Sequence, residues 1–462
     1  MLPEQLKAIV GPSGWTSDPA ELEPHLTEWR GVYHGKTLLM VSPGTTAEVA
    51  AVVGACAAAH TPIVPQGGNT GLCGGAIPDA SGSQVLLSTA RLNRIRAVEP
   101  DDFSMVVEAG CILADVQSQA RAVGRLFPLS LAAEGSCHIG GNLSTNAGGT
   151  SVLKYGTARD QVLGLEVVLA DGSVWDGLRS LRKDTAGYDL KQLFIGAEGT
   201  LGIITAANLR LYPLPPDPVT AILAIPSPVA AVSLLGTLRT RLADQVYAFE
   251  LFSERALSFV LKHIPGTRPP LARSYPWYVL VECAPQQGAD ALYALLMSSI
   301  ESGHAHDAAI SGSDREAAEF WRLRHSISEA QKFEGASLKH DISVPVGRIG
   351  EFIVAAEKAV SAIKPDVRVV AFGHVGDGNV HFNLSQPAGT PAQEFTASRE
   401  RLSAAVYAVT RSFAGSISAE HGIGQAKRDM LQDFRSATEL GLMRAVKQAL
   451  DPGNLMNPGK VL

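Results

Sequence analysis

The residues best suited to chemistry lie close together in GHVGDGNVHFN, residues 373–383. The pattern predicts a strand that ends at His374, a Gly-Asp-Gly turn, and a second short strand that carries His381. Because side chains alternate across a strand, Asn383 shares the strand face of His381. A chain that folds back over a glycine turn can bring two imidazoles together. The segment therefore predicts a pair of histidines able to hold a metal ion.

A carboxylate and another imidazole are adjacent in SAEHGIG, where Glu420 precedes His421. One of them can complete the site, because two imidazoles and a carboxylate bind a divalent cation and leave positions open for substrate. A single histidine is more often structural than metal-binding, but several such residues set in glycine turns favour a metal. Two imidazoles and a carboxylate suit several divalent ions, zinc, manganese and cobalt among them, so the residues alone leave the ion open.

Two glycine-rich segments in the first half are typical of phosphate-binding loops. PQGGNTG, residues 65–71, follows a predicted strand, and GSCHIGGN, residues 135–142, leads on to STNAGG. Glycines let backbone N–H groups converge on an anion without obstruction by Cβ atoms. One such loop could simply form a tight turn, but two fit a ligand with two phosphates. The Rossmann and P-loop fingerprints are absent, which disfavours NAD-type and NTPase functions.

The elements that position the first loop read as strand, helix and strand over residues 37–64. Thr45 and Glu48 form a predicted capping box for a helix that ends near Ala59. Residues 130–150 show no periodic pattern and are expected to form a long functional loop. The other predicted strands of this half are Val85–Leu87, Met105–Glu108 and a hairpin over Leu165–Trp175 that turns at Asp171-Gly172.

The proline-rich segment PLPPDP at 213–218 predicts a domain boundary, because prolines at this density interrupt helices and strands. We expect domains at 1–213 and 214–425 and a C-terminal segment at 426–462 that contains one helix and packs back on the first domain. Strands and helices alternate in the second domain, which favours a mostly antiparallel sheet backed by helices. Its predicted elements are strands at 219–225, 246–252, 278–282, 337–344 and 367–372 and helices at about 229–243 and 314–333.

Composition excludes several classes of function for the 462-residue chain. The formal net charge is −6 and no dense basic cluster occurs, so nucleic acid is not an expected partner. No apolar run is long enough to span a bilayer and the N-terminus lacks a signal-peptide pattern, so we expect a cytoplasmic protein. The five cysteines are scattered without a CxxC motif, which argues against a disulfide framework.

Four long stretches carry a resemblance to a known family: PQGGNTG, GSCHIGGNLSTNAGG, GLEVVLADG and SLRKDTAGYDLKQLFIGAEGTLGIIT. They resemble FAD domains of the vanillyl-alcohol-oxidase (PCMH) type, and within that group the D-2-hydroxyglutarate dehydrogenase family, from about residue 28 to the C-terminus. The resemblance implies an α+β fold in which a two-subdomain α/β FAD domain is joined to a substrate domain. FAD would be held non-covalently, since the first loop lacks histidine. The implied FAD contacts are Pro65, Gly67, Gly68, Asn69, Thr70, Gly71, Gly135, Ser136, Gly140, Gly141, Asn142, Thr145, Asn146, Glu198, Gly199, Ile204 and Asn457.

The same resemblance implies roles in the second half of the chain. His374, His381 and Glu420 match positions that hold a zinc-like ion, and His421 matches the catalytic base that contacts the substrate. Residues that match the substrate site are Arg324, Ser328, Lys339 and Asn383. Arg324 and Ser328 are predicted four residues apart on one helix face, where a basic residue, a hydroxyl and a lysine grip the distal carboxylate of a dicarboxylic acid. Serine stands at 328 where threonine is more usual, so one methyl contact is lost.

The expected function is oxidation of D-2-hydroxyglutarate to 2-oxoglutarate, with hydride transfer to flavin N5. Alternatives are a D-lactate, glycolate or D-malate dehydrogenase of the same fold, a non-catalytic flavin-binding subunit, and a metal hydrolase without flavin. Resemblance points to electron-transfer flavoprotein or a quinone as the electron acceptor. A homodimer is expected only because it is the commonest oligomer.

Overall fold

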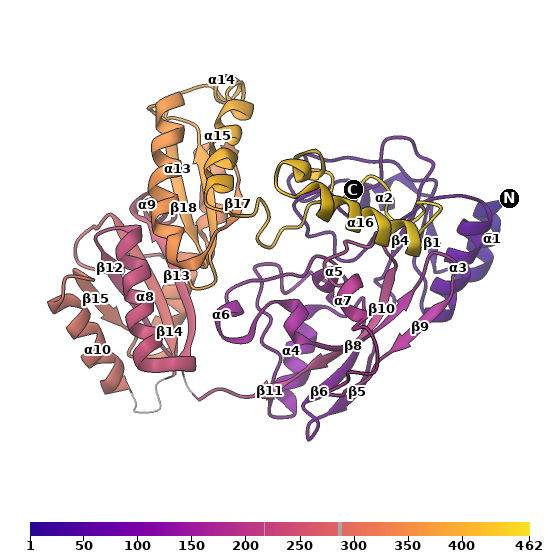
Figure 1. The fold of residues 1–462 in the computed structure, drawn as a ribbon, viewed down its shortest axis with the longest axis horizontal. Helices are drawn as coiled ribbons and strands as arrows, with labels where there is room; N and C mark the ends of the chain where they lie inside the picture. Colours follow the sequence, from indigo (N-terminus) through magenta and orange to yellow (C-terminus); the bar gives the residue numbers. More distant parts are fainter. Residues whose placement is uncertain (217, 285–288) are drawn as a thin grey trace. The chain divides into compact units, whose positions relative to one another are not determined.

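The computed structural model describes residues 1–216, 218–284 and 289–462, which fold into two compact units (Figure 1). Unit 1 comprises Met1–Gly148, Tyr155–Leu214 and Glu420–Leu462, and unit 2 comprises Gly149–Lys154 and Pro215–Ala419. Unit 1 thus takes more of the C-terminal segment than the expected 426–462. The chain leaves unit 1 within the proline-rich segment, of which Asp217 lies outside the described residues.

The first sheet of unit 1 has the strand order β1-β2-β4-β3. β2 (Leu39–Val41) and β3 (Ile63–Gln66) both pair in parallel with β4 (Val85–Ser88), while β1 (Trp15–Thr16) is antiparallel to β2. Helix α3 (Thr46–Ala58) connects β2 to β3 and packs on α1 (Leu2–Val10), and α2 (Pro19–Leu26) precedes β2. The strand-helix-strand prediction is therefore confirmed and places PQGGNTG at the end of β3.

The predicted helix cap at α3 is only half right. Thr45 Oγ1 accepts the backbone N–H of Glu48 at 3.1 Å, as predicted. The Glu48 carboxylate instead accepts the N–H of Gly44 at 2.7 Å. The Glu48 side chain therefore reaches one residue beyond the N-cap, so the capping box is incomplete, although the helix begins where predicted.

The second sheet of unit 1 is antiparallel, with the order β5-β6-β10-β8-β9. Its strands are β5 (Ile95–Glu99), β6 (Ser104–Glu108), β10 (Ile203–Arg210), β8 (Val162–Val168) and β9 (Val174–Gly177). The β8–β9 hairpin is the predicted one. Helix α4 (Leu113–Ala122) follows β6, and the short strands β7 (Arg125–Leu126) and β11 (Tyr212–Pro213) pair with each other.

Residues 130–150 are not the continuous loop that the sequence predicts. Helix α5 (Ile139–Ser144) begins inside the second glycine-rich segment, and α6 (Val152–Tyr155) and η1 (Ala158–Gln161) follow. Glycines disfavour helices intrinsically, so no periodic pattern shows α5. Burial of Ile139 and Leu143, each 1% exposed, stabilises it.

The remaining elements of unit 1 lie near the C-terminus, apart from α7 (Lys191–Phe194). The tail contains η5 (Arg428–Asp433) and α16 (Ala437–Leu450), which has a Ser436/Glu439 capping box. Beyond α16 the chain lies parallel to β3: Ile63 donates to Leu455 O and Asn457 donates to Ile63 O, both at 2.8 Å. The tail thereby extends the first sheet at the strand that leads into PQGGNTG.

Unit 2 is built on one large antiparallel sheet with the order β15-β12-β14-β13-β18-β19-β16, and β17 also pairs with β19. Helices cover both faces, as the two buried clusters on opposite sides show. One face carries α8 (Pro228–Leu242), α13 (Ile349–Ile363) and α15 (Arg399–Ser412), and the other α9 (Glu254–His263) and α11 (Asp314–His325). The strands are β12 (Val219–Ile225), β13 (Val246–Ser253), β14 (Trp277–Cys283), β15 (Asp307–Ile310), β16 (Ser337–Leu338), β17 (Asp341–Ser343), β18 (Arg368–Gly373) and β19 (Asn379–Ser385).

Two predicted elements of unit 2 are interrupted. The helix expected over 314–333 divides into α11, α12 (Ile327–Ala330) and the 3₁₀ helix η3 (Gln331–Glu334). The strand expected over 337–344 breaks between β16 and β17 at His340, whose N–H donates to the side-chain Oδ1 of Asn383 at 3.3 Å. The N–H of His340 thus has a side-chain acceptor in place of a backbone carbonyl. Hydrophobic periodicity in the sequence does not reveal such a contact.

The smaller elements of unit 2 are α10 (Ala289–Glu301), α14 (Ala392–Thr396), η2 (Ala243–Gln245) and η4 (Val346–Arg348). Across the described ranges of both units, every helix is too short or too polar to span a lipid bilayer.

Candidate active site

The two glycine-rich segments of unit 1 line one cavity. They approach so closely that a Cβ atom on Gly68 would lie 2.0 Å from the carbonyl oxygen of Ser136, so only glycine fits there. The cavity is lined by Pro65, Gln66, Gly67, Gly68, Asn69, Thr70, Gly71, Cys73, Gly75, Ala76, Thr89, His138, Gly140, Gly141, Asn142, Ser144, Thr145, Glu198, Gly199, Gly202, Ile203, Ile204 and His421. Backbone from two glycine segments and the N-terminal end of α5 therefore faces one space, an arrangement suited to a diphosphate.

Four of the residues predicted to contact FAD do not line this cavity: Gly135, Ser136, Asn146 and Asn457. Asn146 Oδ1 accepts the N–H of Arg159 at 2.9 Å. Asn457 Nδ2 donates to the carbonyl oxygens of Gly75 and Glu198, at 2.9 and 2.7 Å. In this structure the two asparagines therefore support neighbouring loops, whereas the other thirteen predicted contacts line the cavity.

Several lining residues were missed from the sequence. Gln66 ends strand β3 and Thr89 directly follows strand β4. Ligands of parallel sheets often bind at these carboxyl ends, so the strand pattern could have indicated both residues. His138 precedes α5, and its buried Nδ1 atom has no hydrogen-bond partner. Burial lowers the pKa of His138, which favours the neutral imidazole.

Glu198 fixes the segment that follows His421. Its side chain accepts the N–H groups of Ile423 and Gly424, at 2.6 and 2.8 Å. Burial raises the pKa of Glu198, whereas these N–H groups lower it by stabilising the carboxylate. Gly424 has φ +51° and a Cβ there would lie 2.2 Å from the carbonyl oxygen of Cys73, so the turn requires glycine. His421 is thereby held at the edge of the glycine-lined cavity.

In unit 2, His381 lies on β19 and faces Asp341, its register partner on β17. Asp341 Oδ1 is 3.8 Å from His381 Nδ1, and 3.0 Å from Asn379 Nδ2, which donates to it. The other oxygen, Oδ2, accepts the N–H of Ala419 at 3.0 Å. Asp341 therefore ties the chain just before Glu420 to the strand that carries His381. Asp341 is not recognisable from the sequence, which predicts one continuous strand over 337–344.

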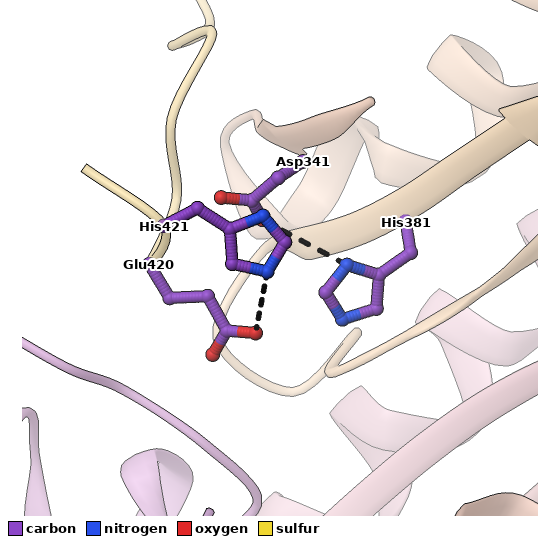
Figure 2. Close-up of side chains that lie close together, drawn as sticks. All are labelled: Asp341, His381, Glu420 and His421. Carbon is purple, nitrogen blue, oxygen red and sulfur yellow. Dashed lines mark ion pairs between the residues drawn. The ribbon is translucent and has the colours of Figure 1, made fainter. Parts of the chain in front are cut away.

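Figure 2 shows Asp341, His381, Glu420 and His421, whose potential ligand atoms all lie within 4.8 Å of one another. Glu420 follows directly on Ala419, so its position next to Asp341 is set locally by the chain. Glu420 Oε1 and His421 Nε2 are 3.7 Å apart. Two imidazoles and two carboxylates are a donor set that fits a divalent ion.

His374 is not one of these four residues, but it lies beside them. Its ring is edge-on to that of His381, with the centroids 5.6 Å apart. His374 Nδ1 is 2.7 Å from Oε1 of Glu250, a carboxylate that is 1% exposed. Burial alone would raise the pKa of Glu250, but His374 and Arg324 lower it to about 2. No motif in the sequence points to Glu250, which lies within the strand β13.

The residues predicted to bind the substrate are in different environments. Arg324 is 5% exposed and forms an ion pair with Glu250, at 2.8 Å. Ser328 is exposed on α12, beyond the helix interruption at Ser326, and Lys339 is half-buried after β16. Asn383 is buried on β19 and donates to Gln331 Oε1 at 2.9 Å. The uninterrupted helix face predicted for Arg324 and Ser328 is therefore not present.

Comparisons with known proteins agree with this architecture. Residues 37–177 match the family described as FAD binding domain, and residues 214–461 match FAD linked oxidases, C-terminal domain. The fold is similar to that of p-cresol methylhydroxylase, with a TM-score of 0.77 at 17% identity over 100% of this chain and 96% of the other. Alkyldihydroxyacetonephosphate synthase has a TM-score of 0.75 at 16% identity, over 99% and 84%. Fold and cavity together define a flavoprotein of the FAD-linked oxidase class.

Curated relatives narrow the class. D-2-hydroxyglutarate dehydrogenase from Xanthomonas citri pv. viticola is 40% identical over 96% of this chain and 93% of its own length. The mitochondrial D-2-hydroxyglutarate dehydrogenase of Bos taurus is 39% identical over 98% and 82%, and the Stutzerimonas stutzeri enzyme is 35% identical over 99% and 98%. The chain belongs to the D-2-hydroxyglutarate dehydrogenase family, and it is an FAD-dependent dehydrogenase.

Proposed function

We propose that this enzyme oxidises D-2-hydroxyglutarate to 2-oxoglutarate at a site that uses FAD and a divalent metal ion, with His421 as the base. The observation that carries the proposal is that His421 lines the same cavity as the two glycine-rich segments. A base at that position is next to the space that suits a flavin. The proposed substrate is that of the D-2-hydroxyglutarate dehydrogenases, which are similar to this chain over nearly its whole length.

The cavity lining suits FAD. The backbone of Gly67–Gly71 and the start of α5 provide N–H groups for the pyrophosphate, and Gly199 and Ile204 provide small and apolar contacts. FAD, when bound, supplies the isoalloxazine N5 that accepts the hydride from the substrate Cα. No histidine occurs in PQGGNTG, so we propose that the cofactor is held without a covalent bond.

We propose His374, His381 and Glu420 as the metal ligands, with zinc as the expected ion. Asp341 supports this set by orienting His381 and by holding Ala419, the neighbour of Glu420. When bound, a divalent cation supplies a Lewis acid that lowers the pKa of the substrate hydroxyl. His421 takes up the hydroxyl proton on a ring nitrogen, a role that imidazole performs well near neutral pH.

We assign binding of the distal carboxylate of the substrate to Arg324, Lys339 and Ser328. Asn383, which lies on the same strand as His381, is also assigned as a substrate contact. Arg324 is suited to this because its planar fork binds both oxygens of a carboxylate. We assign reoxidation of the reduced flavin to electron-transfer flavoprotein or a quinone, which accepts its electrons. We propose a homodimer only on the frequency of that state among oligomers.

The second candidate is a dehydrogenase of the same fold for D-lactate, glycolate or D-malate. The observation that favours it is that Ser328 is exposed on α12, a separate helix from α11, which carries Arg324. A non-catalytic flavin-binding subunit would not need the His/Glu cluster, which this chain has.

Steady-state kinetics with D-2-hydroxyglutarate, D-malate, D-lactate and glycolate separate these functions. We expect the highest kcat/KM with D-2-hydroxyglutarate. A higher value with D-lactate or glycolate would transfer the assignment to the second candidate. No turnover of any of them by protein loaded with FAD and metal would support the subunit.

A further inference from the structure

Glu250 connects two parts of the proposed site inside unit 2. It lies on β13, and its two carboxylate oxygens have different partners. Oε1 is 2.7 Å from His374 Nδ1, and Oε2 accepts from Arg324 Nε at 2.8 Å. The three side chains come from β13, from the turn after β18 and from α11, and all are less than a tenth exposed.

The contact with His374 determines which ring nitrogen carries the proton. An ionised carboxylate only accepts hydrogen bonds, so His374 must donate from Nδ1. A neutral imidazole then has its lone pair on Nε2, the atom that a metal ion requires. Glu250 thus selects the tautomer of His374 that is competent for metal binding.

The contact with Arg324 fixes one edge of the guanidinium group. Its Cζ lies 4.9 Å from the centre of the Phe372 ring, which supports the guanidinium. Nη2 is only 2.8 Å from Glu250 Oε2, but the geometry is poor and Nη2 is buried without a hydrogen-bond acceptor. Burying a guanidinium whose N–H groups lack acceptors costs folding free energy. An anionic ligand would supply the missing acceptor.

We propose that Glu250 is a positioning residue that sets the His374 tautomer for metal binding and at the same time orients Arg324 toward the second carboxylate of the substrate. The proposal rests on the proposed function. It predicts that one substitution weakens metal binding and dicarboxylate selectivity together. Neither effect follows from a residue that only stabilises the sheet.

Glu250→Gln tests the coupling with minimal change of shape. His374 and Arg324 contact different oxygens of Glu250, and glutamine replaces one of these oxygens with an NH2 group, which cannot accept from the partner on that side. We expect zinc affinity to fall by about 10- to 100-fold, measured by titrating chelator-stripped protein with Zn²⁺ against an indicator. At saturating zinc, kcat/KM for D-2-hydroxyglutarate relative to D-lactate should fall by at least about tenfold, the loss of one charged hydrogen bond.

Glu282→Gln is the matched control. Glu282 lies on the neighbouring strand β14, and its carboxylate accepts from Trp321 Nε1 at 2.7 Å. It contacts neither His374 nor Arg324 by any hydrogen bond described, so zinc affinity and selectivity should stay at the wild-type values. Equal behaviour of the two glutamine variants would overturn the proposal. Failure of the wild type to bind zinc would instead remove the metal from the proposed function.

A measurement on the wild type avoids any effect of the substitution on folding. In protein labelled with ¹⁵N-histidine, the long-range proton–nitrogen spectrum of the metal-free state should show His374 protonated at Nδ1. The signal is assigned by its loss in His374→Gln. A neutral ring protonated at Nε2 and not at Nδ1 would contradict the role of Glu250 in selecting the tautomer.

Discussion

Among single residues, the proposed site depends on a few side chains whose partners are distant in the sequence. Glu250 contacts His374 across 124 residues, and Asp341 contacts the N–H of Ala419 across 78. Motif analysis found the histidines because glycine turns surround them. It could not find the two carboxylates, because their strands show only ordinary patterns.

Substitution of His421 tests the proposed base. We expect His421→Ala to lower kcat by about 10²- to 10⁴-fold, because general-base catalysis contributes a factor of that size. The visible flavin spectrum should be retained, since FAD is held by the glycine segments. His304→Ala, which changes a partly exposed histidine of unit 2, is the control. Unchanged turnover of the His421 variant would remove this residue from the mechanism.

Substitution of Arg324 tests whether this residue binds the second carboxylate of the substrate. We expect Arg324→Met to lower kcat/KM for D-2-hydroxyglutarate by at least about tenfold more than for D-lactate. The variant should also lose roughly 3–5 kcal/mol of unfolding free energy, since Glu250 remains buried without its cation. Selectivity is therefore measured below the new melting temperature. Equal losses for both substrates would show that Arg324 does not distinguish them.

Among the elements, the sequence predicts the strands well, but it does not predict where helices and strands are interrupted. It predicts β12 residue for residue and the β8–β9 hairpin correctly. It does not predict α5, because the helix depends on burial of Ile139 and Leu143 and not on propensity. The break at His340 depends on the side chain of Asn383, a tertiary contact.

The turn after His421 gives a prediction at this scale. Glu198→Gln replaces one acceptor for the N–H groups of Ile423 and Gly424 with a donor. We expect kcat to fall by up to about 10²-fold at saturating FAD, with a smaller change in KM, because the base is displaced. Glu439→Gln is the control, since Glu439 also accepts a backbone N–H but caps the exposed start of α16. Equal kcat in both variants would limit Glu198 to a structural role.

The attachment of η3 to its neighbours predicts a pH dependence of stability. Burial of Glu334 alone would raise its pKa, but Lys262, His263 and Arg368 lower it from 4.5 to about 2. The ionised carboxylate therefore stabilises the fold fully above pH 4.5, and this contribution is lost as the pH falls toward 2.

Glu334→Gln should therefore cost roughly 1–3 kcal/mol at neutral pH. The difference from the wild type should shrink as the pH is lowered through the same interval, which urea unfolding at several pH values measures. A difference that is constant with pH would show that the ion pairs of Glu334 do not stabilise the fold.

At the scale of the whole molecule, the chain folds as two units with separate cores. Unit 1 carries the glycine-lined cavity and His421, and unit 2 carries His374, His381 and the residues proposed to bind the substrate. The sequence predicts a boundary in PLPPDP because prolines interrupt regular structure, and in this segment Leu214 belongs to unit 1 and Pro215 to unit 2. The long-range pairing of the C-terminal tail with β3 was predicted only as packing on the first domain, because it depends on backbone contacts with Leu455 and Asn457.

We propose that FAD and a metal ion act together on D-2-hydroxyglutarate. Anaerobic mixing of the FAD- and zinc-loaded enzyme with this substrate, followed by visible absorbance, tests this joint action. We predict rapid bleaching of the oxidised flavin by the D-enantiomer but not the L-enantiomer. Bleaching should be lost after the metal is removed with a chelator and restored by zinc, while the flavin remains bound. An unbleached flavin in the loaded enzyme would show that D-2-hydroxyglutarate is not its substrate, and bleaching at the same rate after chelation would show that the metal takes no part in the oxidation.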